Sequence, residues 1–500
     1  MDWLNRWRET AAPALIVALM VALYPPPLGA QSLPTSAQSA SATDGIRAPD
    51  LRGSTVFGGA EVQPNDLLIN YNRNTTPDAP ADLSPDQRTE HDRASFQGPP
   101  AGHDPRHFRI ELEPLEDRRT RQFFESEPFP HVGWRMGGFI LFQEFEIAPA
   151  WTSNVLATRD ERDDWRADVF SETRLVSNWS NHALELRMAH DRSYHRRFAN
   201  ENDSEQTYEM RGRLDIVRRT NLEVRAARDI RQESRNSIDA ASTTGAPRAD
   251  VITDRINFSL NHRFNRLSLQ LRGSHSITAY EAASIGLSND RDLTRRALAI
   301  RAQWEFRPSL SVFGEFEREQ RRHPAVAATD GLSRNADGER YRAGLALGQT
   351  GEYLRGEASI GYGVQRPKGR ALPDVDAFLI DANVAWRITP LTSLLLDART
   401  EFGETTLSGA PGVVERRIGA SFRHTFTHRL AGEGGISYST QDYRAATLKE
   451  RDLTFSANVE YSLNRHAALF GRYQHVWFRS SDSTRNYDAD TIMVGARLRN

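Results

Sequence analysis

The stretch that decides the fold is residues 208–216, which read YEMRGRLDI. Its even positions, from Tyr208 to Ile216, are apolar or glycine, whereas its odd positions, from Glu209 to Asp215, are all charged. Because successive side chains of a β-strand point to opposite faces, such a strand has one face suited to lipid and one suited to water. A slip of one residue in the pairing would place two arginine side chains in hydrocarbon, which costs about 2–4 kcal/mol of stability for each near the bilayer midplane. The alternation therefore predicts a membrane-spanning strand whose charged face is turned away from lipid.

The same alternation recurs in about eighteen runs between residue 137 and residue 500. The connections between the runs are alternately very short and long. Residues 219–221 and 427–429 are short turns, whereas 230–253 and 320–339 are long polar segments. An even number of strands joined in this way is typical of bacterial outer-membrane barrels. The sequence thus predicts an all-β transmembrane up-and-down antiparallel β-barrel of about 18 strands, with its short turns and both termini in the periplasm.

The first 30 residues have the three parts of a secretory signal peptide. Arg6 and Arg8 give a basic start, residues 11–24 form an apolar stretch, and Ala30 ends a small-residue cleavage site. The alternative is a membrane anchor, but about 14 apolar residues fall short of the roughly 17–25 that span a bilayer. We therefore expect export, cleavage near Ala30, and localisation in the outer membrane of a Gram-negative bacterium.

Residues 31–135 differ in composition from the rest of the chain. Ser, Ala, Pro, Asp and Gly dominate residues 31–105, a composition typical of a largely disordered periplasmic segment. Residues 108–124 mix apolar residues with arginines and could form a short amphipathic helix. The segment could plug the pore, contact a periplasmic partner, or serve as a plain linker. The barrel itself is expected to cover residues 136–500.

Composition excludes several functional classes. The chain has no cysteine, so it forms no disulfide, thiolate metal site or thiol nucleophile. Its net charge of −2 argues against a nucleic-acid partner, which would require a basic excess. A barrel enzyme is the second hypothesis, but we find no G-x-S-x-G motif, metal-spaced histidine pair or phosphate loop, and so expect no enzyme and no catalytic, metal or cofactor residues. The strand histidines share the parity of the lipid-facing residues and are interpreted as interface residues: His190, His262, His275, His424 and His475.

The face opposite the apolar one is expected to line the pore, and it mixes both charge signs. Arginine outnumbers lysine 62 to 2, which gives the wall planar donors suited to carboxylates, phosphates and sugar hydroxyls. Such a lining could be an ion-pair network that stiffens the wall or a binding track for a charged solute. The pore-lining candidates are Arg166, Glu172, Arg187, Arg211, Arg213, Arg225, Arg255, Arg301, Glu315, Arg342, Glu357, Asp381, Arg399, Arg423, Glu460 and Arg472.

Four short stretches resemble a known family. Residues 132–142 (VGWRMGGFILF), 146–155 (EIAPAWTSNV), 243–247 (TTGAP) and 262–267 (HRFNRL) resemble the outer-membrane β-barrel porin family called beta-barrel porin type 2, and the resemblance covers residues 132–500. It implies a barrel porin, and some barrels of this kind act with periplasmic polysaccharide-export proteins as the exit for surface polysaccharides. One departure is the ending Leu498-Arg499-Asn500, because many such barrels end in an aromatic residue.

The sequence therefore predicts an outer-membrane porin that forms an aqueous channel. Its cargo is either a surface polysaccharide, with a periplasmic polysaccharide-export protein as partner, or small solutes that diffuse through a general porin. The sequence identifies outer-membrane lipid as a further partner, but it leaves open the substrate, the ion selectivity and the oligomeric state.

Overall fold

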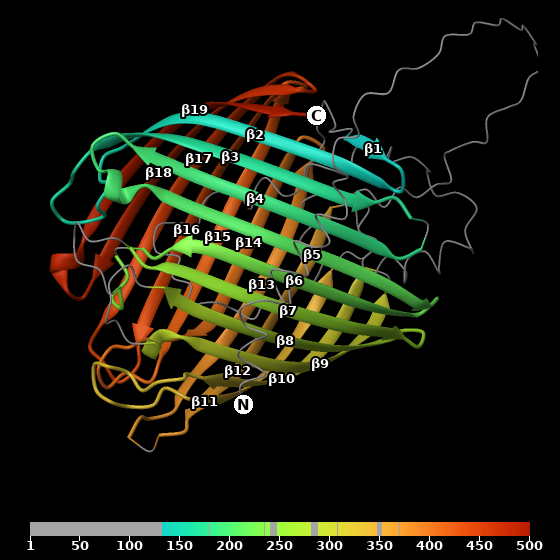
Figure 1. The fold of residues 1–500 in the computed structure, drawn as a ribbon. Helices are drawn as coiled ribbons and strands as arrows, with labels where there is room; N and C mark the ends of the chain where they lie inside the picture. Colours follow the sequence, from blue (N-terminus) through green and yellow to red (C-terminus); the bar gives the residue numbers. More distant parts are fainter. Residues whose placement is uncertain are drawn as a thin grey trace, which may run out of the picture. The chain divides into compact units, whose positions relative to one another are not determined.

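The computed structural model describes residues 133–500 except 180, 235, 241–247, 282–288, 308, 348–352 and 370. Nineteen strands form one sheet, and the eighteen from β2 to β19 close into an antiparallel barrel (Figure 1). Each strand pairs with the next in the chain, and β19 closes the ring by pairing with β2, with Ile492 opposite Trp151. The predicted fold class and strand number are thus confirmed. The predicted signal peptide, and residues 31–132 with the expected helix at 108–124, lie outside the described residues.

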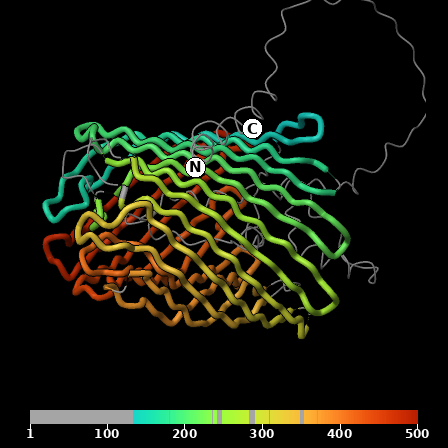
Figure 2. The backbone as a smooth tube through the Cα atoms, turned by 60° about the horizontal axis from the view of Figure 1, so that its bottom comes forward, coloured from blue at the N-terminus to red at the C-terminus, as the bar shows by residue number. Residues whose placement is uncertain are grey.

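The strands of the barrel are long enough to cross a bilayer obliquely, and Figure 2 shows them running at a slant around the wall. Within the described residues, three short 3-10 helices lie in loops: η5 (Ala199–Glu201), η6 (Asn289–Arg291) and η7 (Ser483–Arg485). The strands are β1 (Trp134–Met136), β2 (Phe139–Thr152), β3 (Asp164–Ser177), β4 (Ala183–His195), β5 (Asp203–Val217), β6 (Thr220–Gln232), β7 (Asp250–Arg263), β8 (Leu267–Glu281), β9 (Leu293–Arg307), β10 (Leu310–Arg322), β11 (Ala336–Leu347), β12 (Leu354–Pro367), β13 (Val375–Thr389), β14 (Thr392–Gly403), β15 (Val413–Thr427), β16 (Leu430–Tyr443), β17 (Lys449–Asn464), β18 (Ala467–Ser480) and β19 (Tyr487–Arg499).

The connections alternate between the two ends of the barrel, as predicted. At one end β5 and β6 are joined across Val217 and Thr220, and β15 and β16 across Thr427 and Leu430. At the other end longer segments connect β6 to β7, β10 to β11 and β14 to β15. In outer-membrane barrels the short turns face the periplasm, so the longer segments are the extracellular loops. No helix of the described residues is long and apolar enough to span a membrane.

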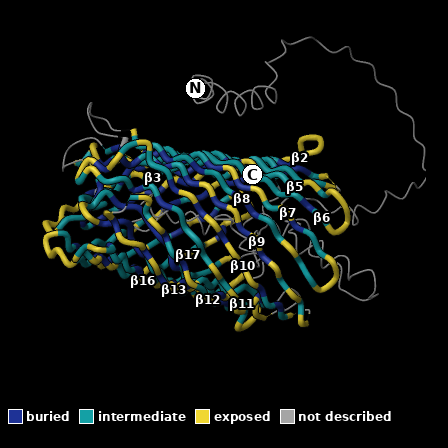
Figure 3. The backbone as a smooth tube through the Cα atoms, turned by 90° about the horizontal axis from the view of Figure 1, so that it is seen from below, coloured by how far each residue is buried: buried dark blue, intermediate teal, exposed yellow. Residues whose placement is uncertain are grey.

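The in-and-out alternation is clearest in β9. Leu298 and Ile300 are 49% and 54% exposed on the outer face, whereas Ala299 and Arg301 between them are 1% and 6% exposed on the inner face. Figure 3 shows the same alternation of exposed and buried residues along other strands. Outward residues are apolar over the middle of the wall, so this surface is the one that meets lipid.

One element was not among the predicted strands. The three residues of β1 fold back on β2, with Trp134 opposite Leu141 and Met136 opposite Phe139. The turn between them contains Gly137 with φ of 61°, a left-handed conformation that favours glycine. Three residues are too few to show a period of two, which is why the alternation did not reveal this strand.

The face assignment makes a direct prediction for neighbouring residues of β16. Ile436 is 51% exposed on the outer wall, and Ser437 lines the luminal cavity described below. Ile436→Arg should lower the folded fraction sharply, because it places a charge in hydrocarbon at about 2–4 kcal/mol. Ser437→Arg should leave the barrel folded. The difference in migration between heated and unheated samples on a detergent gel measures both, and equal folded fractions would contradict the assignment.

Candidate permeation site in the lumen

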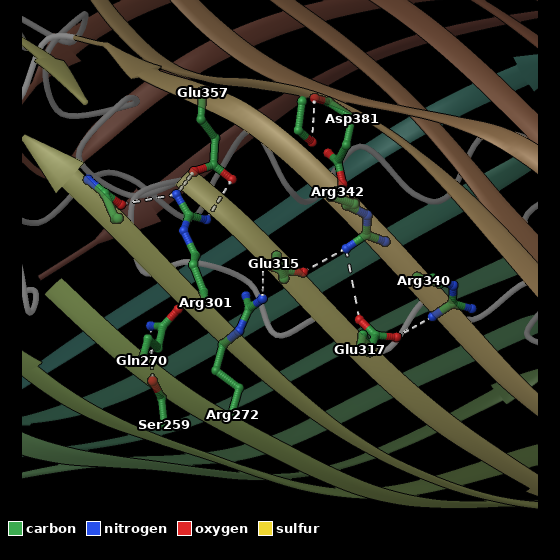
Figure 4. A network of polar contacts seen from close by, with 12 residues as sticks. Ser259, Gln270, Arg272, Arg301, Glu315, Glu317, Arg340, Arg342, Glu357 and Asp381 are labelled. Carbon is green, nitrogen blue, oxygen red and sulfur yellow. Dashed lines mark hydrogen bonds and ion pairs between the residues drawn. The ribbon is translucent and has the colours of Figure 1, made fainter. Parts of the chain in front are cut away.

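The inward side chains form rows in which arginines alternate with carboxylates. On neighbouring strands, Arg342 Nη1 of β11 lies 2.9 Å from Glu315 Oε1 of β10, and Arg272 of β8 contacts the other oxygen of the same carboxylate (Figure 4). One register step further along, Arg340 pairs with Glu317 and Glu319. Glu315 and Glu317 each lie between two guanidinium groups and Glu319 among three, so positive and negative charges alternate along this wall.

One ion pair crosses two strands of the wall. Arg301 of β9 places Nη2 2.7 Å from Oε2 of Glu357 on β12, and thus reaches over β10 and β11. Its guanidinium also lies over the ring of Phe313, 3.6 Å from the ring centroid. These contacts hold the side chain across the inner wall instead of leaving it extended into the lumen (Figure 4).

All sixteen pore-lining candidates lie at inward positions of their strands, and most have a charged partner. The remaining pairs are Arg187–Glu172 at 2.8 Å, Arg225–Glu209 at 2.7 Å, Arg211–Glu209, Arg213–Asp215 at 2.7 Å, Arg255–Asp229 at 3.0 Å, Arg166–Asp168 at 3.0 Å, Arg399–Glu401 at 3.5 Å, Arg472–Glu146 at 3.1 Å and Arg497–Glu460 at 2.6 Å. Asp381 and Arg423 also lie inward, on β13 and β15. This pairing favours the ion-pair network over an uncompensated track for one charge sign.

A cavity of about 690 Å³ lies along one side of the lumen, and its two walls differ in chemistry. One wall comes from β3 to β6 and the other from β15 to β17, where small neutral residues lie among charged ones. Among the sixteen candidates only Arg166, Arg423 and Arg472 line the cavity. The wall from β3 to β6 includes Arg166, Asp168, Asp191, Asp203, Glu205 and Arg231; the wall from β15 to β17 includes Gly419, Ser421, Gly435, Ser437, Ser456 and Asn458, and also the charged residues Arg417, Arg423 and Glu433.

The sequence analysis missed the small residues of β15 to β17 because it selected only charged inward residues. A signal was nevertheless present, since glycine and serine recur at the inward positions of β15 to β17. Small side chains leave room in the lumen, and their hydroxyl and backbone groups can exchange hydrogen bonds with a hydrated solute. The cavity therefore offers a solute neutral hydrogen-bonding groups together with charges of both signs.

The extracellular mouth is bridged by a hydrogen bond between two distant loops. Asp239, in the loop between β6 and β7, accepts bonds from the backbone N–H and the hydroxyl of Thr406, with donor distances of 2.8 and 2.6 Å. It also accepts a bond of 3.1 Å from the Thr405 hydroxyl in the loop between β14 and β15. Six strands separate β7 from β14 on the shorter way round the ring, so this contact must cross the lumen.

Further contacts tie three other loops to this bridge. Arg334, between β10 and β11, donates to the carbonyl oxygens of Thr405 and Leu407 at 3.2 and 3.0 Å. Arg291, between β8 and β9, donates to the carbonyl oxygen of Asp239 at 2.8 Å, and Arg485, between β18 and β19, to that of Asn236 at 2.6 Å. We call the described residues of these five loops the cap. Asp239, Thr405 and Arg334 are at most 9% exposed, so the cap is a packed layer.

Two carboxyl groups of the cap are held in their charged form. Burial opposes ionisation of Asp330, but hydrogen bonds from Arg334 and from the N–H groups of Gly409 and Leu332 lower its pKa below the ordinary value. Burial likewise opposes ionisation of Glu404, yet Arg321 and His323 lower its pKa. At neutral pH both groups are therefore anions that accept hydrogen bonds within the cap and from the strand ends below it.

These lowered pKa values predict how the cap depends on pH. A carboxyl group whose pKa falls on folding stabilises the folded arrangement above its ordinary pKa, and this stabilisation is lost as pH drops through the lowered value. Conductance in a planar bilayer should therefore stay constant from pH 7 to about 4 and rise below that. Asp330→Asn should conduct more at pH 7 and gain less on acidification. A conductance unaffected by acid would contradict this reasoning.

Two of the strand histidines make contacts within the wall. His262 Nδ1 lies 2.7 Å from the hydroxyl of Thr220 on the neighbouring strand, and its ring packs against Phe264. His475 lies on the outer face and pairs with Asp490 at 2.6 Å. Over the described part of the chain, no three His, Asp or Glu side chains gather so as to hold a metal ion.

Comparison with known proteins gives a family and structures of the same general kind. No curated protein matches the chain. OccAB4 of Acinetobacter baumannii has 11% identity and a TM-score of 0.39, over 72% of this chain and 98% of its own. OpdK of Pseudomonas aeruginosa has 12% identity and a TM-score of 0.39, over 72% of this chain and 99% of its own. A BenF-like porin of Pseudomonas fluorescens Pf-5 has 9% identity and a TM-score of 0.41, over 73% of this chain and 100% of its own. The family model described as "Putative beta-barrel porin 2" matches residues 127–500, so the chain belongs to this family of outer-membrane barrel porins and is a channel protein.

Proposed function

We propose that this channel passes hydroxyl-rich, weakly charged solutes, and that its cargo is a surface polysaccharide leaving the cell. The observation that carries the proposal is the luminal cavity, where Gly419, Ser421 and Ser437 leave room among polar and charged side chains of both signs. Sugar hydroxyls both donate and accept hydrogen bonds, as do the serine and asparagine side chains of the wall from β15 to β17.

The balanced inner wall supports the same proposal through its electrostatics. A lumen lined by one sign of charge would concentrate ions of the other sign and exclude its own. Here the arginines around Glu315 and Glu317 are matched by carboxylates. We therefore expect weak discrimination between small anions and cations.

A general diffusion porin for small solutes is the second candidate. The cap favours it in one respect, because hydrogen bonds between Asp239 and Thr406 join two loops across the mouth. Small solutes could pass beside such a bridge, whereas a polysaccharide requires the bridge to open. The two candidates therefore differ in whether the cap must move.

In this proposal residues 1–30 direct export and residues 31–135 act at the periplasmic mouth. Cleavage near Ala30 would release the chain into the periplasm for insertion into the outer membrane. Residues 31–135 would then lie at the periplasmic mouth, either as a plug or as an arm that binds a periplasmic polysaccharide-export protein. The proposal involves no catalysis and no cofactor.

Gene deletion combined with channel recording tests the proposal. Deleting the gene should abolish staining of a surface polysaccharide, and the full-length gene should restore it. The purified barrel should show a reversal potential close to zero in a salt gradient, as a weakly selective channel does. Unchanged polysaccharide in the deletion strain would favour the diffusion porin, and a strongly ion-selective channel would overturn the argument from balanced charge.

A further inference from the structure

The outer wall carries a charged rim above its apolar belt. In β9 the outward row runs from Ile300 and Leu298, both about half exposed, to the exposed Arg296. In β10 it changes from Phe316 to the exposed Arg318. Both arginines lie on the side of the belt where the long loops emerge, which is the extracellular side. A charge at this height is tolerated because the penalty for an outward arginine falls to about 0–1 kcal/mol near the interface.

Arg296 and Arg318 are close neighbours on adjacent strands. Arg318 is opposite Leu298 and Arg296 is opposite Gln320, so the two arginines are diagonal neighbours on one face. Such positions are about 7–8 Å apart, within reach of one ligand for side chains as long as arginine. Arg318 lies directly opposite Glu339 of β11 and interacts electrostatically with Asp337 of the same strand. His275 of β8 is opposite Arg296 and adds a third nitrogen-bearing side chain.

The carboxylates of the adjoining strand neutralise this pair only in part, because they are shared with other cations. Asp337 of β11 lies 2.7 Å from Arg322 Nη2 and 3.7 Å from the amine of Lys368. Glu339 of the same strand accepts a bond of 3.3 Å from Arg366 and one of 3.4 Å from the Tyr341 hydroxyl. Against Asp337 and Glu339 the rim carries Arg296, Arg318, Arg322, Arg366 and Lys368, so it keeps an excess of cations at the height of the head groups.

We infer that Arg296 and Arg318 bind the phosphate groups of a phosphorylated glycolipid in the outer leaflet. Guanidinium groups bind phosphate oxygens with paired, charge-assisted hydrogen bonds. Their outward direction excludes a solute in the lumen as the ligand, and their position at the edge of the apolar belt fits a head group whose acyl chains lie along Leu298 and Ile300. A free phosphate ion would gain nothing from that adjoining apolar surface.

The test uses the full-length barrel in nanodiscs and three lipid probes: bisphosphorylated lipid A, its fully dephosphorylated form, and phosphatidylglycerol. Native mass spectrometry of the released barrel counts the lipids that remain bound. Bisphosphorylated lipid A should be retained by the wild type at least about tenfold more than either other probe. Arg296→Gln combined with Arg318→Gln should remove most of that difference, and the corresponding lysine pair should restore part of it.

The matched control removes two outward arginines elsewhere on the rim, Arg416 of β15 and Arg451 of β17, which flank Thr440 of β16. Arg416→Gln combined with Arg451→Gln should retain lipid A like the wild type. An equal loss of bound lipid A in both double variants would overturn the proposal of a local site. Retention of phosphatidylglycerol equal to that of lipid A would overturn the assignment of the ligand as a glycolipid. Heat-dependent gel migration confirms that each variant is folded, so a loss of lipid cannot be mistaken for a loss of barrel.

Discussion

Replacing Asp239 by alanine is expected to open the extracellular cap and to raise single-channel conductance several-fold. The carboxylate accepts bonds from the Thr406 backbone N–H and from the hydroxyls of Thr405 and Thr406, all of them across the lumen. A hydrogen bond to a charged group contributes about 1.5–3 kcal/mol. Losing two such bonds shifts the opening equilibrium by at least about 100-fold. Recordings of the variant in planar bilayers should show a larger or more frequently open state.

The control is an acidic residue of an extracellular loop outside the cap. Asp374, between β12 and β13, lies 3.9 Å from Arg366 at the end of β12. Asp374→Ala should conduct like the wild type. If Asp239→Ala also conducts like the wild type while the barrel remains folded, the bridge does not limit permeation, and conductance is set deeper in the lumen.

The barrel could be predicted from sequence because its signal is local. In residues 208–216 the alternation of apolar and charged side chains fixes the two faces, and each hairpin is set by the short turn that follows its strand. The same parity placed Arg213 inward and Leu214 outward, and the structure shows Arg213 buried and Leu214 49% exposed. Strand number and face therefore follow from a pattern that extends over only a few residues.

The partners of the inward residues could not be predicted in the same way. Parity places Arg301 and Glu357 on the inner face, but their pairing depends on the register of three consecutive strand pairs and on the reach of both side chains across β10 and β11. A change of two residues in any one register would keep both side chains inward and separate them. The identity of such pairs is a property of the closed sheet.

The contacts of the cap could not be predicted from the sequence for a different reason. Asp239 and Thr405 are separated by 166 residues and occur in polar loops of ordinary composition. Nothing near either residue marks it, because the contact exists only once the barrel has brought two distant hairpins to the same mouth. The small residues Gly419 and Ser437 could be placed on the inner face from the sequence alternation. That they line a cavity could be recognised only from the three-dimensional structure.

Linking the two sides of the cap covalently is expected to abolish polysaccharide export while leaving small-ion conductance largely intact. The chain has no cysteine, so Asp239→Cys combined with Thr406→Cys introduces the only two thiols. The native side chains are in contact, with 2.6 Å between Asp239 Oδ1 and Thr406 Oγ1, so a short bis-methanethiosulfonate reagent can bridge the two sulfurs. Surface staining should disappear on treatment and return when a reductant removes the bridge.

Each single cysteine variant serves as a control, because it reacts with the reagent but cannot be bridged within one barrel. A channel that carries only small solutes predicts a different result: polysaccharide staining should persist in the bridged cells, and conductance should change by no more than it does in the single variants. Because the bridge crosses the lumen between hairpins held in the wall by β7 and β14, the proposed export route requires a polymer to displace it. Persistent export through a fully bridged cap would therefore exclude this mouth as the polysaccharide exit.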